Sequence, residues 1–89
     1  MIKDPFESAA DSPIAPSEFC FAIEPSDTAG LMQATKAIYV GGGGDVTVRT
    51  VRADADVTFR NVPSGSILDI RVNAVRSSGT SATDLVALA

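Results

Sequence analysis

The side chains that most often carry out protein chemistry are scarce in this sequence of 89 residues. It has no histidine, so neither a Ser-His-Asp triad nor the usual Cys–His pair can form. The single cysteine, Cys20, lies between Phe19 and Phe21, and this apolar setting predicts a buried core thiol. One thiol cannot fill a tetrahedral zinc site. The sequence therefore predicts no catalytic residue, no metal and no cofactor.

The glycines 41–44 invite comparison with a phosphate-binding loop, but such a loop needs a helix after it. The residues that follow, 46–51, have a strand pattern, so we expect a hairpin connection that uses positive φ angles. The acidic pairs Asp54/Asp56 and Asp4/Glu7 lack the spacing of a calcium loop, and we interpret them as solvated turns.

The arginines are the charged residues with the clearest pattern. Lys36 is the only lysine after position 30, and the other basic residues there are arginines. Four of them fall on positions opposite the apolar side of predicted strands: Arg49, Arg60, Arg71 and Arg76. One interpretation is an ordinary solvated sheet face. The other is a set of salt bridges across subunit contacts, since arginine makes bidentate contacts with carboxylates.

These residues are carried by short segments with the two-residue alternation of strands, separated by Gly, Pro, Ser and Asp turns. The run 67–72 is the longest, and a phase shift at Val75 suggests continuation through a β-bulge. The sequence predicts an all-β domain, a small antiparallel sandwich or barrel of about six strands. The predicted strands cover residues 18–24, 36–40, 46–51, 57–60, 67–72 and 84–88.

Residues 1–17 differ from the rest and predict an extended, Pro-rich, acidic arm before a single β domain at 18–89. Phe6 and Ile14 are the bulky apolar side chains between Lys3 and Glu18, so we expect them to anchor the arm in grooves of another surface. The alternative is a disordered tail.

The small size of the chain favours assembly. A domain this short has a marginal core, and disulfides and metals are excluded as supports, which leaves oligomerisation. The net charge of −4 argues against nucleic-acid binding. No stretch approaches the ~18 apolar residues of a membrane helix, so we expect no membrane partner.

Several segments together resemble one family, the head spike base proteins of tailed phages and of gene transfer agents, the phage-derived particles of alphaproteobacteria. The resemblance covers about residues 19–89 and rests on residues 21–27 (FAIEPSD), 36–46 (KAIYVGGGGDV), 56–59 (DVTF), 61–65 (NVPSG), 71–72 (RV), 75–76 (VR) and 79–88 (GTSATDLVAL).

The resemblance implies a non-enzymatic virion structural protein, made in the bacterial cytoplasm and located on the surface of the head. It implies a ring on the capsid, at vertices, that carries a fibre or spike protein. The expected partners are further copies of the chain, with a pentamer preferred, the major capsid protein and the fibre.

Two other functions are kept as alternatives. A glycan-binding or adhesion module predicts exposed aromatic side chains in loops, whereas the loops here contain Gly, Ser, Ala and Asp. A phage tail or capsid decoration protein would also be part of the virion, but it would lie at another site and be present in a different number of copies.

Overall fold

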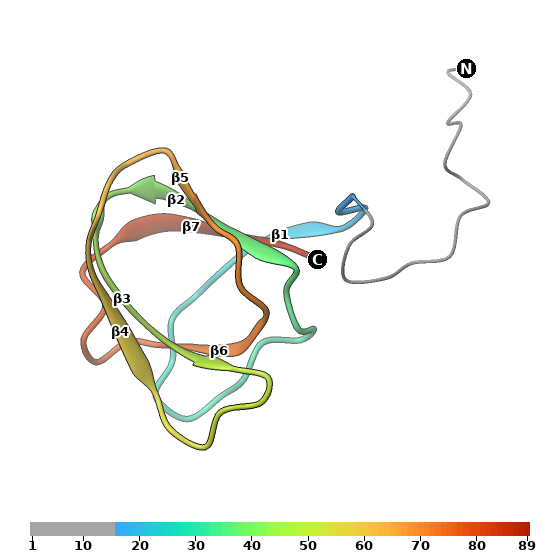
Figure 1. Cartoon of the computed structure of the whole chain (residues 1–89), viewed down its shortest axis with the longest axis horizontal. Helices are drawn as coiled ribbons and strands as arrows, with labels where there is room; N and C mark the ends of the chain where they lie inside the picture. Colours follow the sequence, from blue (N-terminus) through green and yellow to red (C-terminus); the bar gives the residue numbers. More distant parts are fainter. Residues whose placement is uncertain (1–15) are drawn as a thin grey trace.

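A computed structural model describes residues 16–89, which form two antiparallel sheets packed face to face (Figure 1). One sheet has four strands in the order β1-β7-β2-β5 and the other has three in the order β4-β3-β6. The described part of the chain contains no helix, which confirms the predicted all-β class and selects the sandwich. The strands are β1 (Cys20–Ala22), β2 (Ala37–Gly42), β3 (Gly44–Thr50), β4 (Val57–Val62), β5 (Ser66–Leu68), β6 (Val72–Arg76) and β7 (Thr83–Leu88).

The core lies between the sheets and is built from alternate residues of their central strands. Ile38 and Val40 of β2 face Val46 and Val48 of β3, and all four are fully buried. Burying one such side chain stabilises the fold by about 1.5–3 kcal/mol. The core is completed by smaller contributions from the flanking strands, namely Val72, Val75, Leu85 and Ala87.

The glycines 41–44 form a corner between the two sheets, and the predicted hairpin is wrong. β2 pairs with β5 and β7, whereas β3 pairs with β4 and β6, so the two strands joined by this run do not pair with each other. The chain turns here in crowded surroundings: a Cβ on Gly43 would lie 2.6 Å from the carbonyl oxygen of Val62. Gly44 has a φ of 156°, so the expected positive φ is present. The glycines therefore allow close backbone approach.

The run 67–76 also changes sheets, and for this reason the structure has seven strands instead of six. β5 ends at Leu68 in one sheet and β6 begins at Val72 in the other. At the crossing, the buried Thr35 hydroxyl donates to the carbonyl oxygen of Ile70 and accepts from the N–H of Val72, both at 3.1 Å. The predicted irregularity near Val75 is present as a register shift, since Arg49 pairs with Ala74 but Thr50 with Val72.

The segment between β1 and β2 covers the free edge of β6. Its backbone N–H groups at Ser26, Leu31 and Thr35 donate to carbonyl oxygens of Val75, Asn73 and Val72. An edge strand otherwise exposes unpaired backbone groups that can pair with another chain. This edge of the smaller sheet is therefore closed by the chain itself.

The first predicted strand, 18–24, is shorter than expected and only partly buried. β1 spans three residues and pairs with β7. Ile23 is buried and Phe21 packs against the core, but Phe19 is 46% exposed and contacts Phe21 with ring centroids 5.5 Å apart. Phe19 lies where the sandwich ends, beside Ala89, so the opposite sheet does not cover it.

Candidate assembly surfaces

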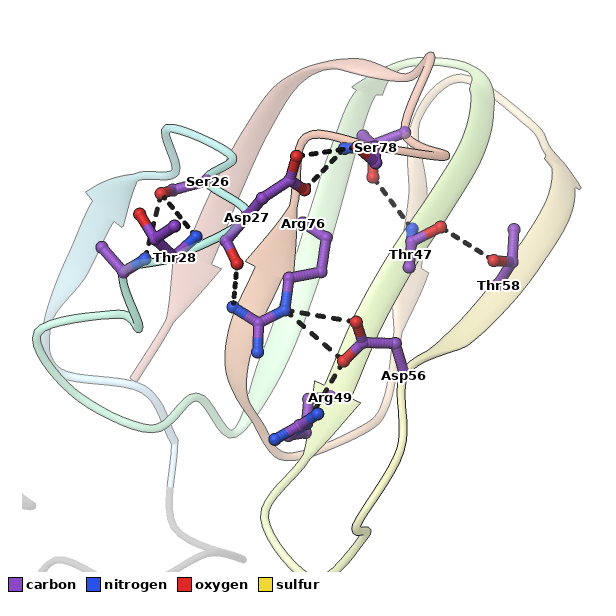
Figure 2. A network of polar contacts seen from close by, with 11 residues as sticks. Ser26, Asp27, Thr28, Thr47, Arg49, Asp56, Thr58, Arg76 and Ser78 are labelled. Carbon is purple, nitrogen blue, oxygen red and sulfur yellow. Dashed lines mark hydrogen bonds and ion pairs between the residues drawn. The ribbon is translucent and has the colours of Figure 1, made fainter.

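The outer face of the three-stranded sheet carries a network of polar contacts centred on Asp56 (Figure 2). Its carboxylate lies 3.2 Å from Nε of Arg49 on β3 and 3.3 Å from Nε of Arg76 on β6. The two arginines belong to neighbouring strands, so the turn before β4 places one acid between them. Asp56, which we interpreted as part of a solvated turn, instead pairs with two of the predicted interface residues.

Asp27 joins the same network from the segment before β2. Its carboxylate accepts hydrogen bonds from the N–H of Ser78 at 2.9 Å and from the Ser78 hydroxyl at 2.7 Å. These bonds, led by the backbone one, hold the pKa of Asp27 below its ordinary value because they favour the charged form. The Asp27 carbonyl accepts from Arg76, so Arg76 is held from two sides.

Two threonines complete this face at its centre. The Thr47 and Thr58 hydroxyls form a hydrogen bond of 2.8 Å between β3 and β4, and the N–H of Thr47 donates to the Thr80 hydroxyl. Thr47 is buried although it points away from the core, because the turn at Gly79 lies against it. Loops of the same chain thus contact the β3 and β6 part of this face, whereas Thr58 and Arg60 of β4 remain exposed.

The remaining predicted site residues lie apart from this network. Arg60 on β4 contacts the carboxylate of Asp45 at 3.4 Å, and its side chain is 75% exposed. Arg71 lies at the crossing between the sheets and donates to the carbonyl oxygen of Thr35. Phe6 and Ile14 fall outside the described residues. The structure therefore brings Arg49 and Arg76 together and separates Arg60 and Arg71 from them.

The outer face of the four-stranded sheet is different, and our sequence analysis missed it. We define the apolar face as the outward residues of β1, β7, β2 and β5. Tyr39 pairs with Val86 on one side and with Ile67 on the other, and Ala22 extends this row across β1. A second row contains smaller or partly buried residues, namely Cys20, Leu88 and Ala37.

The signal for this face is present in the sequence. A strand with one buried side normally alternates apolar with polar residues. In 37–40 and 85–88, by contrast, the residues between the core positions are Tyr39, Val86 and Leu88. Both sides of the central strands are apolar, which is typical of strands covered on both faces.

Cys20 belongs to the apolar face, so the predicted core thiol is wrong. The thiol is exposed, and it lies 3.6 Å from the Ser17 hydroxyl. β1 places Phe21 inward, and because successive side chains of a strand point to opposite sides, Cys20 points outward.

Within residues 16–89, no group of three or more His, Cys, Asp or Glu side chains could hold a metal ion. The same residues contain no buried side-chain nitrogen or oxygen atom without a hydrogen-bond partner. No helix among them is long and apolar enough to span a bilayer.

Fold and surfaces together define a class, a small β-sandwich domain suited to protein–protein assembly. A scan of protein-family models and a search of curated proteins returned no match. Among solved structures, the chain is similar to one described as "Capsid of native GTA particle computed with C5 symmetry", where GTA denotes a gene transfer agent. The two chains are 32% identical with a TM-score of 0.86, and the match covers 98% of this chain and 100% of that one.

At this identity and coverage, the chain belongs to the family of that gene transfer agent capsid chain. The match supports a capsid-associated structural protein of a phage-like particle, in agreement with the broader part of the resemblance found in the sequence.

Proposed function

We propose that this chain is a head spike base subunit, a non-enzymatic structural protein that forms a ring on the outside of the capsid and carries a fibre or spike protein. The observation that carries the proposal is the full-length match to a chain of a gene transfer agent capsid. That match concerns the capsid as a whole. The ring, the vertex and the fibre are our inference from the sequence segments that resemble head spike base proteins.

A pentamer at a vertex is compatible with the fivefold symmetry of the similar structure. The similar structure was computed with C5 symmetry, so each of its chains recurs around one axis. A ring of identical subunits repeats every weak contact, and this multivalency holds a small protein on a large shell. A domain with a marginal core also gains stability from its neighbours in such a ring.

The predicted arm, residues 1–17, is our candidate for attachment to the major capsid protein. Its last residues are tied to the sandwich: the Ser17 hydroxyl donates to the carbonyl oxygen of Ala89, and Lys36 donates to that of Pro16. The arm therefore leaves from the end of the sandwich where β7 terminates. Phe6 and Ile14 are the anchors that we expect to enter grooves of the shell.

Arg60 and Arg71 are the better candidates for contacts with other subunits among the predicted arginines. Arg49 and Arg76 already share the carboxylate of Asp56, so a second acid would compete with an existing pair. The Arg60 side chain pairs with Asp45 but is 75% exposed, against 38% and 15% for Arg49 and Arg76. Arg71 donates to the carbonyl oxygen of Thr35 and has no ion-pair partner within residues 16–89.

Counting and locating the copies of this chain on purified particles tests the proposal. The chain would be quantified by mass spectrometry against the major capsid protein and located by electron microscopy of particles that carry a tagged copy. A vertex ring gives a small copy number and label at the vertices. A copy number that follows the major capsid protein, or label on the tail, would overturn the proposal in favour of a decoration or tail protein.

Removal of residues 1–15 tests the role of the arm within the same experiment. We expect the truncated chain, which keeps Pro16 and Ser17, to fold and to be lost from the particles. Retention of the truncated chain at the normal copy number would show that the sandwich itself contacts the shell.

A further inference from the structure

The apolar face offers a contact surface that the described part of the chain leaves open. Ile67 is 61% exposed and Tyr39 is 39% exposed, although both lie in regular strands. The antiparallel register sets Ala22, Val86, Tyr39 and Ile67 side by side across the whole sheet. Contiguous exposed apolar surface of this kind marks a site of interaction.

The border of the apolar face is acidic. Asp84 lies next to the row of Tyr39, since a Cβ added to Gly41 would be 2.7 Å from the Cβ of Asp84. Glu24 follows β1 and Asp69 follows β5, and all three carboxylates are exposed. A partner for this face should therefore present apolar side chains flanked by positive charge.

The described chain itself contains such a surface, which we name the arginine-flanked edge: Val51, Arg52 and Val57. Val51 and Val57 are exposed by 38% and 49% at the two ends of the loop that joins β3 to β4. Arg52 is exposed and has no ion-pair partner within residues 16–89. Figure 1 shows this loop at the opposite side of the molecule from β2 and β5.

We propose that the apolar face of one copy packs against the arginine-flanked edge of the next copy. This inference rests on the proposed ring and names its subunit contact. Two different surfaces on opposite sides of a molecule make a head-to-tail contact, and such contacts close into rings when the rotation between subunits allows it.

Charge complementarity is the reason why we expect the partner on the apolar face to be a second copy of this chain. Each chain carries a net charge of −4, so two copies repel unless their contact pairs opposite charges. The acidic border and the exposed Arg52, which has no ion-pair partner within residues 16–89, provide that pairing. The other outer face is less suited, because Arg49 and Arg76 already share the carboxylate of Asp56 and the Arg76 side chain is only 15% exposed.

Single substitutions on each surface test the contact in the full-length chain. We expect Ile67→Asp and Val57→Asp each to weaken the association constant by at least about a hundredfold, as loss of a central apolar contact does. Met32→Asp is the matched control, because Met32 is 76% exposed but lies outside both surfaces. Mass is measured by sedimentation, and far-UV circular dichroism confirms that each variant is folded.

Mixing the two variants distinguishes this contact from other modes of assembly. Ile67→Asp retains an intact arginine-flanked edge and Val57→Asp retains an intact apolar face, so a head-to-tail contact predicts a one-to-one heterodimer from two monomeric proteins. A mixture that remains monomeric would overturn the inference. So would a wild-type chain that is monomeric at high concentration, or a wild-type oligomer that survives either substitution.

The copy count on particles separates this inference from the proposed function. If the chain is found at the vertices but both variants still assemble normally, only the proposed subunit contact is refuted. The opposite result is also possible: the chain is absent from the vertices, while both variants fail to assemble alone and form heterodimers when mixed. That result refutes only the proposed function.

Discussion

The two outer faces of the sandwich are built on similar inner faces but have opposite surfaces. Val46 and Val48 bury one side of the smaller sheet, as Ile38 and Val40 bury one side of the larger sheet. On their outward sides, Thr47 and Arg49 of β3 are engaged by loops, whereas Tyr39 of β2 is exposed. The β3 and β6 part of the smaller sheet's outer face is contacted by loops of the chain itself, whereas the outer face of the larger sheet exposes apolar side chains.

Because of this difference, we expect the two outer faces to contribute to different processes, one to the stability of the fold and the other to association. Exposed ion pairs contribute about 0–1 kcal/mol each, so the Asp56 network mainly holds the loops in position on the smaller sheet. An exposed apolar face adds little to the stability of a single copy, and it contributes when a partner covers it. We therefore expect changes on the smaller sheet to alter unfolding and changes on the apolar face to alter association.

The largest loss of folding stability is expected at the glycine corner, because the chain passes there from one sheet to the other. Gly43→Ala places a Cβ 2.6 Å from the Val62 carbonyl oxygen and 2.8 Å from the Ser64 nitrogen, at the corner between the sheets. These are backbone atoms that cannot rotate away, so the free energy of unfolding should fall by about 3 kcal/mol. Urea unfolding measures the loss. Gly65→Asn is the control, because a Cβ there meets nothing within 4 Å and asparagine tolerates positive φ.

A smaller effect is expected from the centre of the polar network. Asp56→Asn removes the charge shared by Arg49 and Arg76 and should lower the free energy of unfolding by about 1 kcal/mol. Urea unfolding at low and high salt measures the loss, which should shrink at high salt because salt screens exposed pairs. Asp54→Asn provides the comparison, since Asp54 is exposed and forms no ion pair among the described residues. Equal losses in the two variants would contradict the role of Asp56.

A matched exchange of polar and apolar residues tests the two faces directly. Thr58→Val removes the partner of the buried Thr47 hydroxyl and should cost about 1 kcal/mol of unfolding free energy. Ile67→Thr keeps a β-branched residue at an exposed position and should change that free energy by less than about 0.5 kcal/mol. Unfolding at low protein concentration measures both. The comparison fails if Ile67→Thr is the more destabilising change.

The smallest expected effect is a local response to acid. Because hydrogen bonds from Ser78 depress the pKa of Asp27, its stabilising contribution is present above the ordinary value of 3.8. The contribution is lost as the pH falls through the lower folded-state pKa. NMR titration of the Ser78 amide should show a midpoint below 3.8, and this transition should be absent in Asp27→Asn. A wild-type midpoint at 3.8 or above would contradict the pairing.

Much of the fold could be predicted from local pattern. The strands around 37–40, 46–50, 57–60 and 84–88 lie where alternation and β-forming residues indicated, and the irregularity near Val75 is a register shift. The predicted arginines also lie on outward or loop positions. The apolar face was missed because we interpreted Tyr39 and Val86 simply as strand residues, without asking what covers the second side of their strands.

The amino-acid sequence by itself determined the all-β class, the approximate strands and the absence of histidine chemistry, since these depend on composition and on neighbours along the chain. The tertiary structure decided which strands share a sheet. It separated β2 from β3 at the glycine corner and divided 66–76 between two sheets. It also decided that Asp56 serves two arginines and that Cys20 faces outward. The physical reason is that alternation specifies which side of a strand is buried, whereas strand pairing depends on packing between residues distant in sequence.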